Sequence, residues 1–296
     1  MDTIDKKIYF YRILMKKIGK VVTSDKVFSK INTLPFTNGE RYLDLENENS
    51  QCMYIEPIKQ PLRANIGTVR TKNLPMTEQK GVQDPLNLPP GVGLYEGTHF
   101  VIFSNNVMGA EYNYYGPRIS CLKNYIPSKV PSLVDEVELI PIMRHDFMEQ
   151  ISKIGEIKKF RMKIQSDNII LTEKLNANLH SMFEQAKRVA YDTEDLDITL
   201  NLSHNMKLSM LDKLSEWLPI PEVLSSLSVL KIHAKNEETR KMETFDLLQD
   251  YMLSVKPVNK KDELHRSVDK NSMYNAIESS YDELKSEINS VIGNEK

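Results

Sequence analysis

The chain has 296 residues, of which 40% are hydrophobic and 27% are charged, so a packed core is expected rather than disorder. Its 39 lysines and arginines nearly balance its 41 aspartates and glutamates, which excludes attraction of nucleic acid or acidic lipid through net charge alone. No apolar run approaches the roughly 18 residues of a membrane helix, and the N-terminus lacks a signal-peptide pattern, so we expect a cytoplasmic protein with two free cysteines.

The first part of the chain predicts an antiparallel sheet. Residues 6–15 are apolar on both faces of an extended chain, as in a central strand. Residues 26–35 predict a short helix. Further short strands are expected at 40–46, 52–58 and 64–71. The Pro- and Gly-rich segment 72–97 predicts a long loop without regular structure, and such a loop is usually functional.

Residues 98–115 predict a β-hairpin, because alternating apolar runs flank Asn105-Asn106. A two-residue turn at these asparagines would place His99 opposite Tyr112, where the two side chains could hydrogen-bond, and would put Glu111 on the other face. A three-residue turn would bring His99 and Glu111 onto one face, about two residues apart. An acid–base pair of His99 and Glu111 therefore depends on the turn.

The hairpin leads into a predicted helix at 117–126, with Pro117 in its first turn and Pro127 ending it. Arg118 lies in that first turn, where a cation gains nothing from the helix dipole. It is either solvated, or it pairs with an acidic side chain or binds an anion.

The second part of the chain mixes helices with strands. Strands are expected at 137–142, 160–165 and 196–203, a hairpin at 227–248, and helices at 146–157, 171–189, 206–218 and 273–292. The fold class is therefore α+β, with a mostly antiparallel β domain at 1–135 followed by a mixed α/β domain at 136–296. Arg161 and Lys163 share one strand face, which is either a basic surface or the solvated side of a half-exposed sheet.

No motif with recognisable catalytic or ligand spacing occurs. The chain has no glycine-rich phosphate loop, no zinc-ligand pattern and no nucleophile elbow. The sequence therefore predicts no metal site and no cofactor, and it gives no catalytic residue.

A functional surface is expected where the loop 72–97 meets the end of the hairpin and the helix at 117–126. A proline-rich loop loses little entropy on binding, helix N-termini accept anions, and tyrosines offer contact area with a polar tip. The alternative is that the loop only wraps over the hairpin and the tyrosines complete the core. The residues expected to bind are Tyr95, Glu96, His99, Tyr112, Tyr114 and Arg118.

The segment LYEGTHFVIFSNNVMGAEYNYYGPR (94–118) resembles a block found in uncharacterised bacterial and phage proteins from mobile-element and phage-defence neighbourhoods. The segments 243–258 and 268–288 have the same character. The resemblance implies a bacterial or phage cytoplasmic protein that acts beside partner proteins. It carries no catalytic motif, so it transfers no functional residue.

These features predict a non-catalytic recognition or regulatory component of a bacterial multi-protein system, of the phage-defence kind, that binds a protein partner and no membrane. The alternative function is a nucleic-acid-processing enzyme, a metal-dependent nuclease whose site is made of dispersed residues. Nucleic acid as a partner and self-association into a homo-oligomer both stay open.

Overall fold

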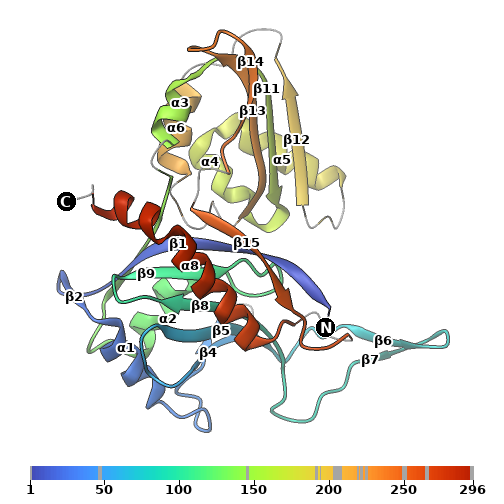
Figure 1. Ribbon diagram of the computed structural model, residues 1–296. Helices are drawn as coiled ribbons and strands as arrows, with labels where there is room; N and C mark the ends of the chain where they lie inside the picture. The colour runs from blue at the N-terminus through green and yellow to red at the C-terminus, as the bar shows by residue number, and fades with distance from the viewer. Residues whose placement is uncertain are drawn as a thin grey trace. The chain divides into compact units, whose positions relative to one another are not determined.

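The structure is a computed structural model that describes residues 2–45, 49–144, 147–190, 193, 195–202, 209–218, 220, 223, 226–248, 252–263 and 267–293 (Figure 1). The chain forms two compact units, Met1–Leu139 with Ser254–Asp282, and Ile140–Leu253 with Glu283–Lys296. The expected α+β class is confirmed. Whereas each domain was expected to be one continuous stretch, residues 254–282 return to the first unit, because strand β15 (Leu253–Asn259) pairs with β1 (Thr3–Lys17).

The first unit is built on an antiparallel sheet in which β1 is central, as residues 6–15 predicted. Ile8 and Phe10 face one side of β1 and Tyr9 and Tyr11 the other, and all four are buried, so both faces of the sheet are covered there. The main strand order is β10-β1-β9-β8-β5-β4-β3, and β2 also pairs with β1. Their bounds are β2 (Lys20–Val22), β3 (Leu43–Asp44), β4 (Ser50–Ile55), β5 (Leu62–Arg70), β8 (Leu94–Ile102), β9 (Val107–Glu111) and β10 (Glu136–Pro141).

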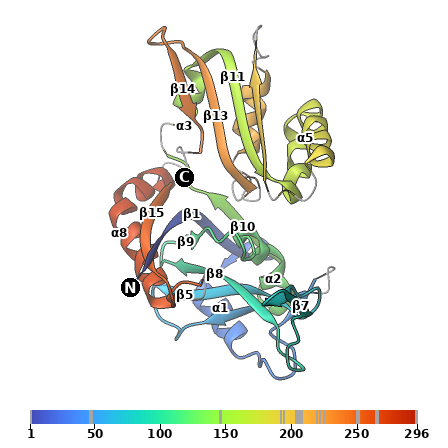
Figure 2. The same cartoon turned by 90° about the vertical axis from the view of Figure 1, so that its right-hand side faces the viewer.

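Helices cover the two faces of this sheet. Helix α1 (Ser24–Asn32) packs through Phe28, whose ring meets Phe100 edge-on with centroids 6.0 Å apart. Helix α8 (Lys270–Gly293) covers the opposite face, where the ring of Tyr281 stacks on Phe103 at 3.7 Å between centroids. Figures 1 and 2 show the sheet lying between α1 and the first part of α8.

The β8–β9 hairpin is confirmed, but its expected turn is wrong. The loop has three residues, 104–106, and is closed by the N–H of Phe103, which donates to the carbonyl oxygen of Val107 at 2.8 Å. A two-residue type I′ turn requires a positive φ at both of its central residues. In this loop only Asn106 has a positive φ, of 61°. The three-residue alternative, with His99 and Glu111 two residues apart along the sheet, required a loop at 105–107, so the observed loop lies one residue nearer the N-terminus. Val101 pairs with Gly109, and His99 lies across from Glu111.

The observed register decides which side chains face α8. Side-chain direction alternates along a strand, so the odd-numbered residues of β8 and β9 all face that helix. Gly109 is among them, and a Cβ atom there would fall 2.6 Å from Cγ2 of Ile277. The missing side chain lets α8 approach the sheet closely, directly beside the strand position of Glu111.

Segment 72–97 contains regular structure that was not expected. Strands β6 (Met76–Gln79) and β7 (Val82–Pro85) form a separate exposed hairpin, which projects as a narrow arm in Figure 1. Gly81 lies in its turn with a φ of 85°, a conformation that glycine adopts without strain. The loop expectation is therefore wrong over this hairpin and from Leu94 onward, where β8 begins.

The helix expected at 117–126 begins later and ends later. A 3-10 turn at Ile119–Cys121 leads into α2 (Leu122–Lys129), and Pro127 lies inside α2 instead of ending it. A proline removes one intrahelical hydrogen bond, and the buried side chains of Tyr125 and Ile126 hold this helix in place. Arg118 consequently precedes the helical turns, with extended backbone angles.

The second unit contains an antiparallel sheet in the order β12-β11-β13-β14, which confirms the predicted strands and hairpin. The expected helix at 171–189 is broken, because Asn176 is extended and its side chain accepts the backbone N–H groups of Asn178 and Leu179. The helix expected at 146–157 ends at Ser152, and its expected cap Asp146 lies outside the described residues, as do residues 206–208 of the helix after β12. The bounds are α3 (Phe147–Ser152), β11 (Ile154–Gln165), α4 (Thr172–Leu175), α5 (Ala177–Val189), β12 (Asp195–Asn201), α6 (Ser209–Trp217), β13 (Leu227–Asn236) and β14 (Met242–Asp246).

On the exposed face of this second sheet, the described side chains of Arg161 and Lys163 are both paired with carboxylates. Arg161 forms an ion pair with Asp197 at 2.6 Å, and Lys163 forms one with Asp195 at 3.0 Å. The carboxylates of Asp197 and Asp195 on β12 thus offset Arg161 and Lys163 on β11, which favours the solvated side of a half-exposed sheet over a basic surface at these residues.

We expect Val101→Asp or Phe103→Asp to lower the free energy of unfolding by about 3 kcal/mol or more, because each buries an unpaired charge in the core of the first unit. The matched control is Val82→Asp on the projecting arm, where the valine is 58% exposed and we expect a change within about 0.5 kcal/mol. Chemical denaturation measures both values. Equal stability of Val101→Asp and Val82→Asp would contradict the buried hairpin.

Candidate functional site

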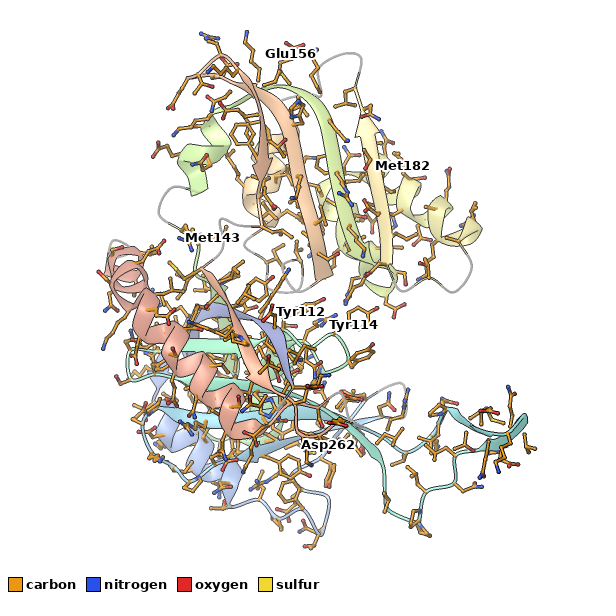
Figure 3. The ribbon with its side chains drawn as sticks, turned by 45° about the vertical axis from the view of Figure 1, so that its right-hand side comes forward. Tyr112, Tyr114, Met143, Glu156, Met182 and Asp262 are labelled. Atoms are coloured by element: carbon orange, nitrogen blue, oxygen red, sulfur yellow. The ribbon has the colours of Figure 1, made fainter. Side chains whose placement is uncertain are left out.

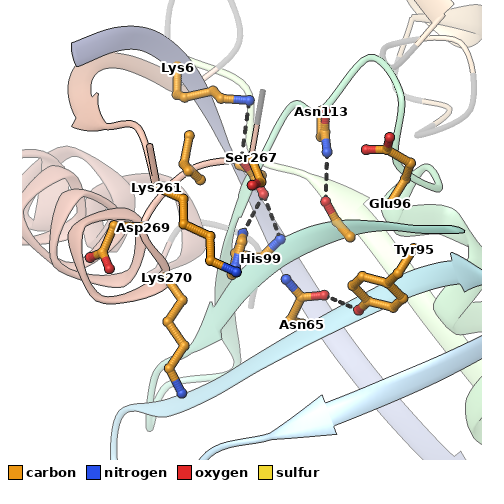
Figure 4. A pocket seen from close by; sticks show the side chains of 13 residues that line it. Lys6, Asn65, Tyr95, Glu96, His99, Asn113, Lys261, Ser267, Asp269 and Lys270 are labelled. Atoms are coloured by element: carbon orange, nitrogen blue, oxygen red, sulfur yellow. Dashed lines mark hydrogen bonds and ion pairs between the residues drawn. The ribbon is translucent and has the colours of Figure 1, made fainter. Parts of the chain in front are cut away.

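A pocket of about 420 Å³ lies on the first unit, beyond the N-terminal end of α8 (Figure 4). Its volume is in the range of small-molecule sites. Strands β1, β5, β8 and β9 supply one part of its wall, and the segment that leads into α8 supplies the rest. The lining residues are Lys6, Asn65, Tyr95, Glu96, Gly97, His99, Glu111, Asn113, Lys261, Ser267, Val268, Asp269 and Lys270.

The centre of the pocket wall is a pair formed by His99 and Glu111. Oε1 of Glu111 lies 2.6 Å from Nδ1 of His99 and also accepts the backbone N–H of His99 at 2.9 Å. The alternative arrangement, with His99 opposite Tyr112, is wrong, because the hairpin register places Glu111 across from His99. The acid–base pair that the sequence left open is therefore present.

Glu111 is an ionised carboxylate held almost entirely out of water, with a side chain that is 1% exposed. Burial acts to raise the pKa of Glu111, but the hydrogen bond and charge of His99, the ammonium of Lys6 and the backbone N–H of His99 together lower it below its ordinary value. Lys6 Nζ lies 3.6 Å from Oε2, which is an ion pair but not a hydrogen bond. No residue that the structure describes donates a hydrogen bond to Oε2.

The carboxylate fixes the tautomer of His99. An ionised carboxylate only accepts hydrogen bonds, so Nδ1 carries the proton and Nε2 is an acceptor while the imidazole is neutral. The imidazole ring also packs against α8, where the ring of Tyr274 meets it edge-on with centroids 5.3 Å apart. His99 is thus a fixed acceptor in the pocket wall, an arrangement suited to accepting a proton or a hydrogen bond from a bound molecule.

The three lysines of the pocket have different surroundings. Lys6 pairs with Glu111, and Lys270 donates to Glu56 at 2.7 Å. Lys261 forms no ion pair with any residue in the described part of the chain. In Figure 4 its side chain extends across the pocket toward His99. Among the described lysines that line the pocket, Lys261 is therefore the one whose charge is available to a ligand.

The floor of the pocket is formed by the paired antiparallel strands β5 and β8. The hydroxyl of Tyr95 donates to Oδ1 of Asn65, and Asn113 donates to the carbonyl oxygen of Gly97 at 2.7 Å. A Cβ atom on Gly97 would fall 2.3 Å from Oδ1 of Asn65, so only glycine leaves room for that amide. The floor thus presents amide and hydroxyl groups in fixed positions.

The structure brings together half of the residues that the sequence singled out. Tyr95, Glu96 and His99 line the pocket. The other three, Tyr112, Tyr114 and Arg118, do not line the pocket. They lie in the segment 112–118 that follows β9, and Figure 3 labels the two tyrosines.

That loop is held by Arg118. Its guanidinium lies 4.7 Å from the ring centroid of Tyr112, and it donates to the carbonyl oxygen of Asn113 at 2.9 Å. Because Asn113 is a wall residue, Arg118 positions one side of the pocket without lining it.

Sequence reasoning missed Lys6, Asn65, Lys261 and residues 267–270. Lys261 and residues 267–270 reach the pocket because β15 pairs with β1 and returns the chain to the first unit, whereas Lys6 and Asn65 lie on strands of the same sheet. One signal was available at Asp269, whose carboxylate accepts the backbone N–H of Ser272 at 2.7 Å and marks the start of α8.

The described residues contain no group of three or more His, Cys, Asp or Glu side chains arranged to hold a metal ion. They also contain no helix that is long and apolar enough to cross a bilayer.

Comparison with known proteins identifies one family. Residues 103–289, more than half of the chain, match the family described as "Family of unknown function (DUF6731)". The match includes Glu111 and the segment 261–270, and it begins after Tyr95 and His99. None of the curated proteins matches the chain.

We expect Glu111→Gln to lower the free energy of unfolding at pH 7 by about 1–3 kcal/mol, because charge-assisted hydrogen bonds are lost. The folded-state pKa of Glu111 is lowered from 4.5, so its contribution is present above that pH and is lost as the pH falls through the lowered pKa. The difference between wild type and variant should therefore shrink in acid. Denaturation at pH 7, 5 and 3.5 measures it, and a constant difference would contradict an ionised Glu111.

Proposed function

We propose that this chain, which belongs to the DUF6731 family of unknown function, acts by recognition: its first unit binds an anionic ligand in the His99 pocket. Binding there serves a regulatory role in a multi-protein system. The observation that carries the proposal is Lys261, a cation with no ion-pair partner among the described residues, on the wall of a ligand-sized pocket.

The expected binding residues divide into two groups under this proposal. Tyr95, Glu96 and His99 contact the ligand. The group of Tyr112, Tyr114 and Arg118 contacts a protein partner. A second hollow of about 270 Å³ lies beside the loop, since residues 115–117, between Tyr114 and Arg118 in the sequence, line it together with Glu96. Tyrosines and arginines are frequent at the energetic centres of protein interfaces.

The setting we propose is a bacterial system of the phage-defence kind, in the cytoplasm, with protein partners. Its support is the resemblance of residues 94–118 to proteins from such neighbourhoods.

We expect inorganic phosphate, glycerol phosphate or glycerate to raise the melting temperature of the protein by about 3 °C or more at saturating concentration, because a ligand that binds only the folded state stabilises it. Lys261→Ala should weaken the affinity about tenfold, through loss of a charge-assisted contact. Thermal unfolding and titration calorimetry measure these effects. The matched control is Lys30→Ala on the exposed face of α1, which should bind as wild type does.

Two results would contradict the proposal. One is a Lys261→Ala variant that binds the probes as tightly as wild type. The other is turnover: cleavage of RNA or DNA by the purified protein, abolished by His99→Ala, would favour the alternative of a nucleic-acid-processing enzyme. The observation that favours that alternative is the His99–Glu111 pair, since such a pair can act as a general base.

The partner surface is tested separately. We expect Tyr114→Ala to leave the melting temperature and probe affinity unchanged and to reduce biological activity, because its side chain does not line the pocket. Arg118→Ala should reduce both activity and probe affinity, because Arg118 holds the backbone of Asn113. Full activity of both variants, with normal folding, would place the functional surface elsewhere.

A further inference from the structure

We infer that the ligand of the His99 pocket is a small anion that also carries a hydroxyl group, with the hydroxyl bound at Oε2 of Glu111 and the anionic group at Lys261. The inference rests on the proposed function and deepens it, because it specifies the second chemical group that the ligand must have.

The first step is the state of Glu111. One of its carboxylate oxygens receives two donors from His99, whereas Oε2 is buried without a hydrogen-bond donor among the described residues. A buried carboxylate oxygen that lacks a donor is destabilising, so a group that donates to it binds favourably. Glu111 lines the pocket, and because Oε2 has almost no accessible surface, a small shift of the Glu111 or Lys6 side chain must expose it to the donor of a ligand.

The second step concerns the kind of donor. The ammonium of Lys6 lies 3.6 Å from Oε2. A ligand ammonium would be repelled by this neighbour, whereas a hydroxyl can donate to Oε2 and accept from Lys6 at the same time. The site therefore selects a hydroxyl over an amine.

The third step is the opposite requirement of Lys261. Its charge has no acidic partner among the described residues, while Lys6 and Lys270 already pair with Glu111 and Glu56. A phosphate or carboxylate on the ligand would supply that partner. Since both groups line one pocket of about 420 Å³, a single small molecule can meet both requirements.

Matched ligand pairs test this inference on the full-length protein. Glycerol phosphate and propyl phosphate differ only in their hydroxyl groups, as do glycerate and propionate. We expect the hydroxylated member of at least one pair to bind tenfold or more tightly in calorimetry. Whether the phosphate or the carboxylate pair binds identifies the anionic group.

Two variants separate the two contacts. Glu111→Gln keeps an acceptor for His99 but replaces Oε2 with a donor, so the affinity ratio within the pair should fall to about one. Lys261→Ala should weaken both members of the pair equally and leave the ratio unchanged. The wild-type ratio needs no variant, so the test stands even if Glu111→Gln folds poorly.

Two outcomes overturn the inference, and only one of them also overturns the proposed function. Equal affinity of both members in wild type would mean that the hydroxyl does not reach Oε2 and is not required, while anion recognition stands. No binding of any of the four probes would overturn both the inference and anion recognition.

Discussion

One backbone hydrogen bond, from the N–H of Phe103 to the carbonyl oxygen of Val107, sets the register on which the chemistry of the first unit depends. It closes a three-residue turn, and the strands beyond it then place Glu111 across from His99. A shift of one residue would turn every side chain of β9 to the other face. The carboxylate of Glu111 would then be buried away from both His99 and Lys6, which is strongly unfavourable for a charged group.

The same face of the sheet must also accept α8. Gly109 permits the close approach of Ile277, and Tyr281 stacks on Phe103. About two helical turns nearer the start of α8, Tyr274 packs against His99. The helix that completes the apolar core therefore also fixes the imidazole of the pocket. Core packing and site geometry are one arrangement here, so substitutions along the inner face of α8 alter both.

Much of the fold follows from local patterns, whereas the site does not. Alternating apolar residues revealed the hairpin and β1, and the stripe of Tyr274, Ile277 and Tyr281 revealed α8. Asn105 and Asn106 suit both two- and three-residue turns, so the sequence could not decide which residues face His99. The break at Asn176 was hidden because the apolar spacing continues through it, although asparagine is a good helix cap.

The lysines of the pocket were hidden for another reason. Lys6 and Lys261 become neighbours only through the pairing of β15 with β1, two strands separated by most of the chain. No local periodicity encodes that pairing. Tyr95 and His99 were found because they belong to a dense aromatic segment, which draws attention whatever its partners are.

The discontinuous first unit has a consequence for how the protein is made. On the ribosome, β1, which is apolar on both faces, emerges more than 200 residues before its partner β15 and the covering helix α8. Until then the nascent sheet exposes the face that α8 will cover, which is the kind of surface that chaperones bind. The pocket is completed only when Lys261 and Lys270 arrive, so its wall cannot form during the synthesis of the residues between β1 and β15.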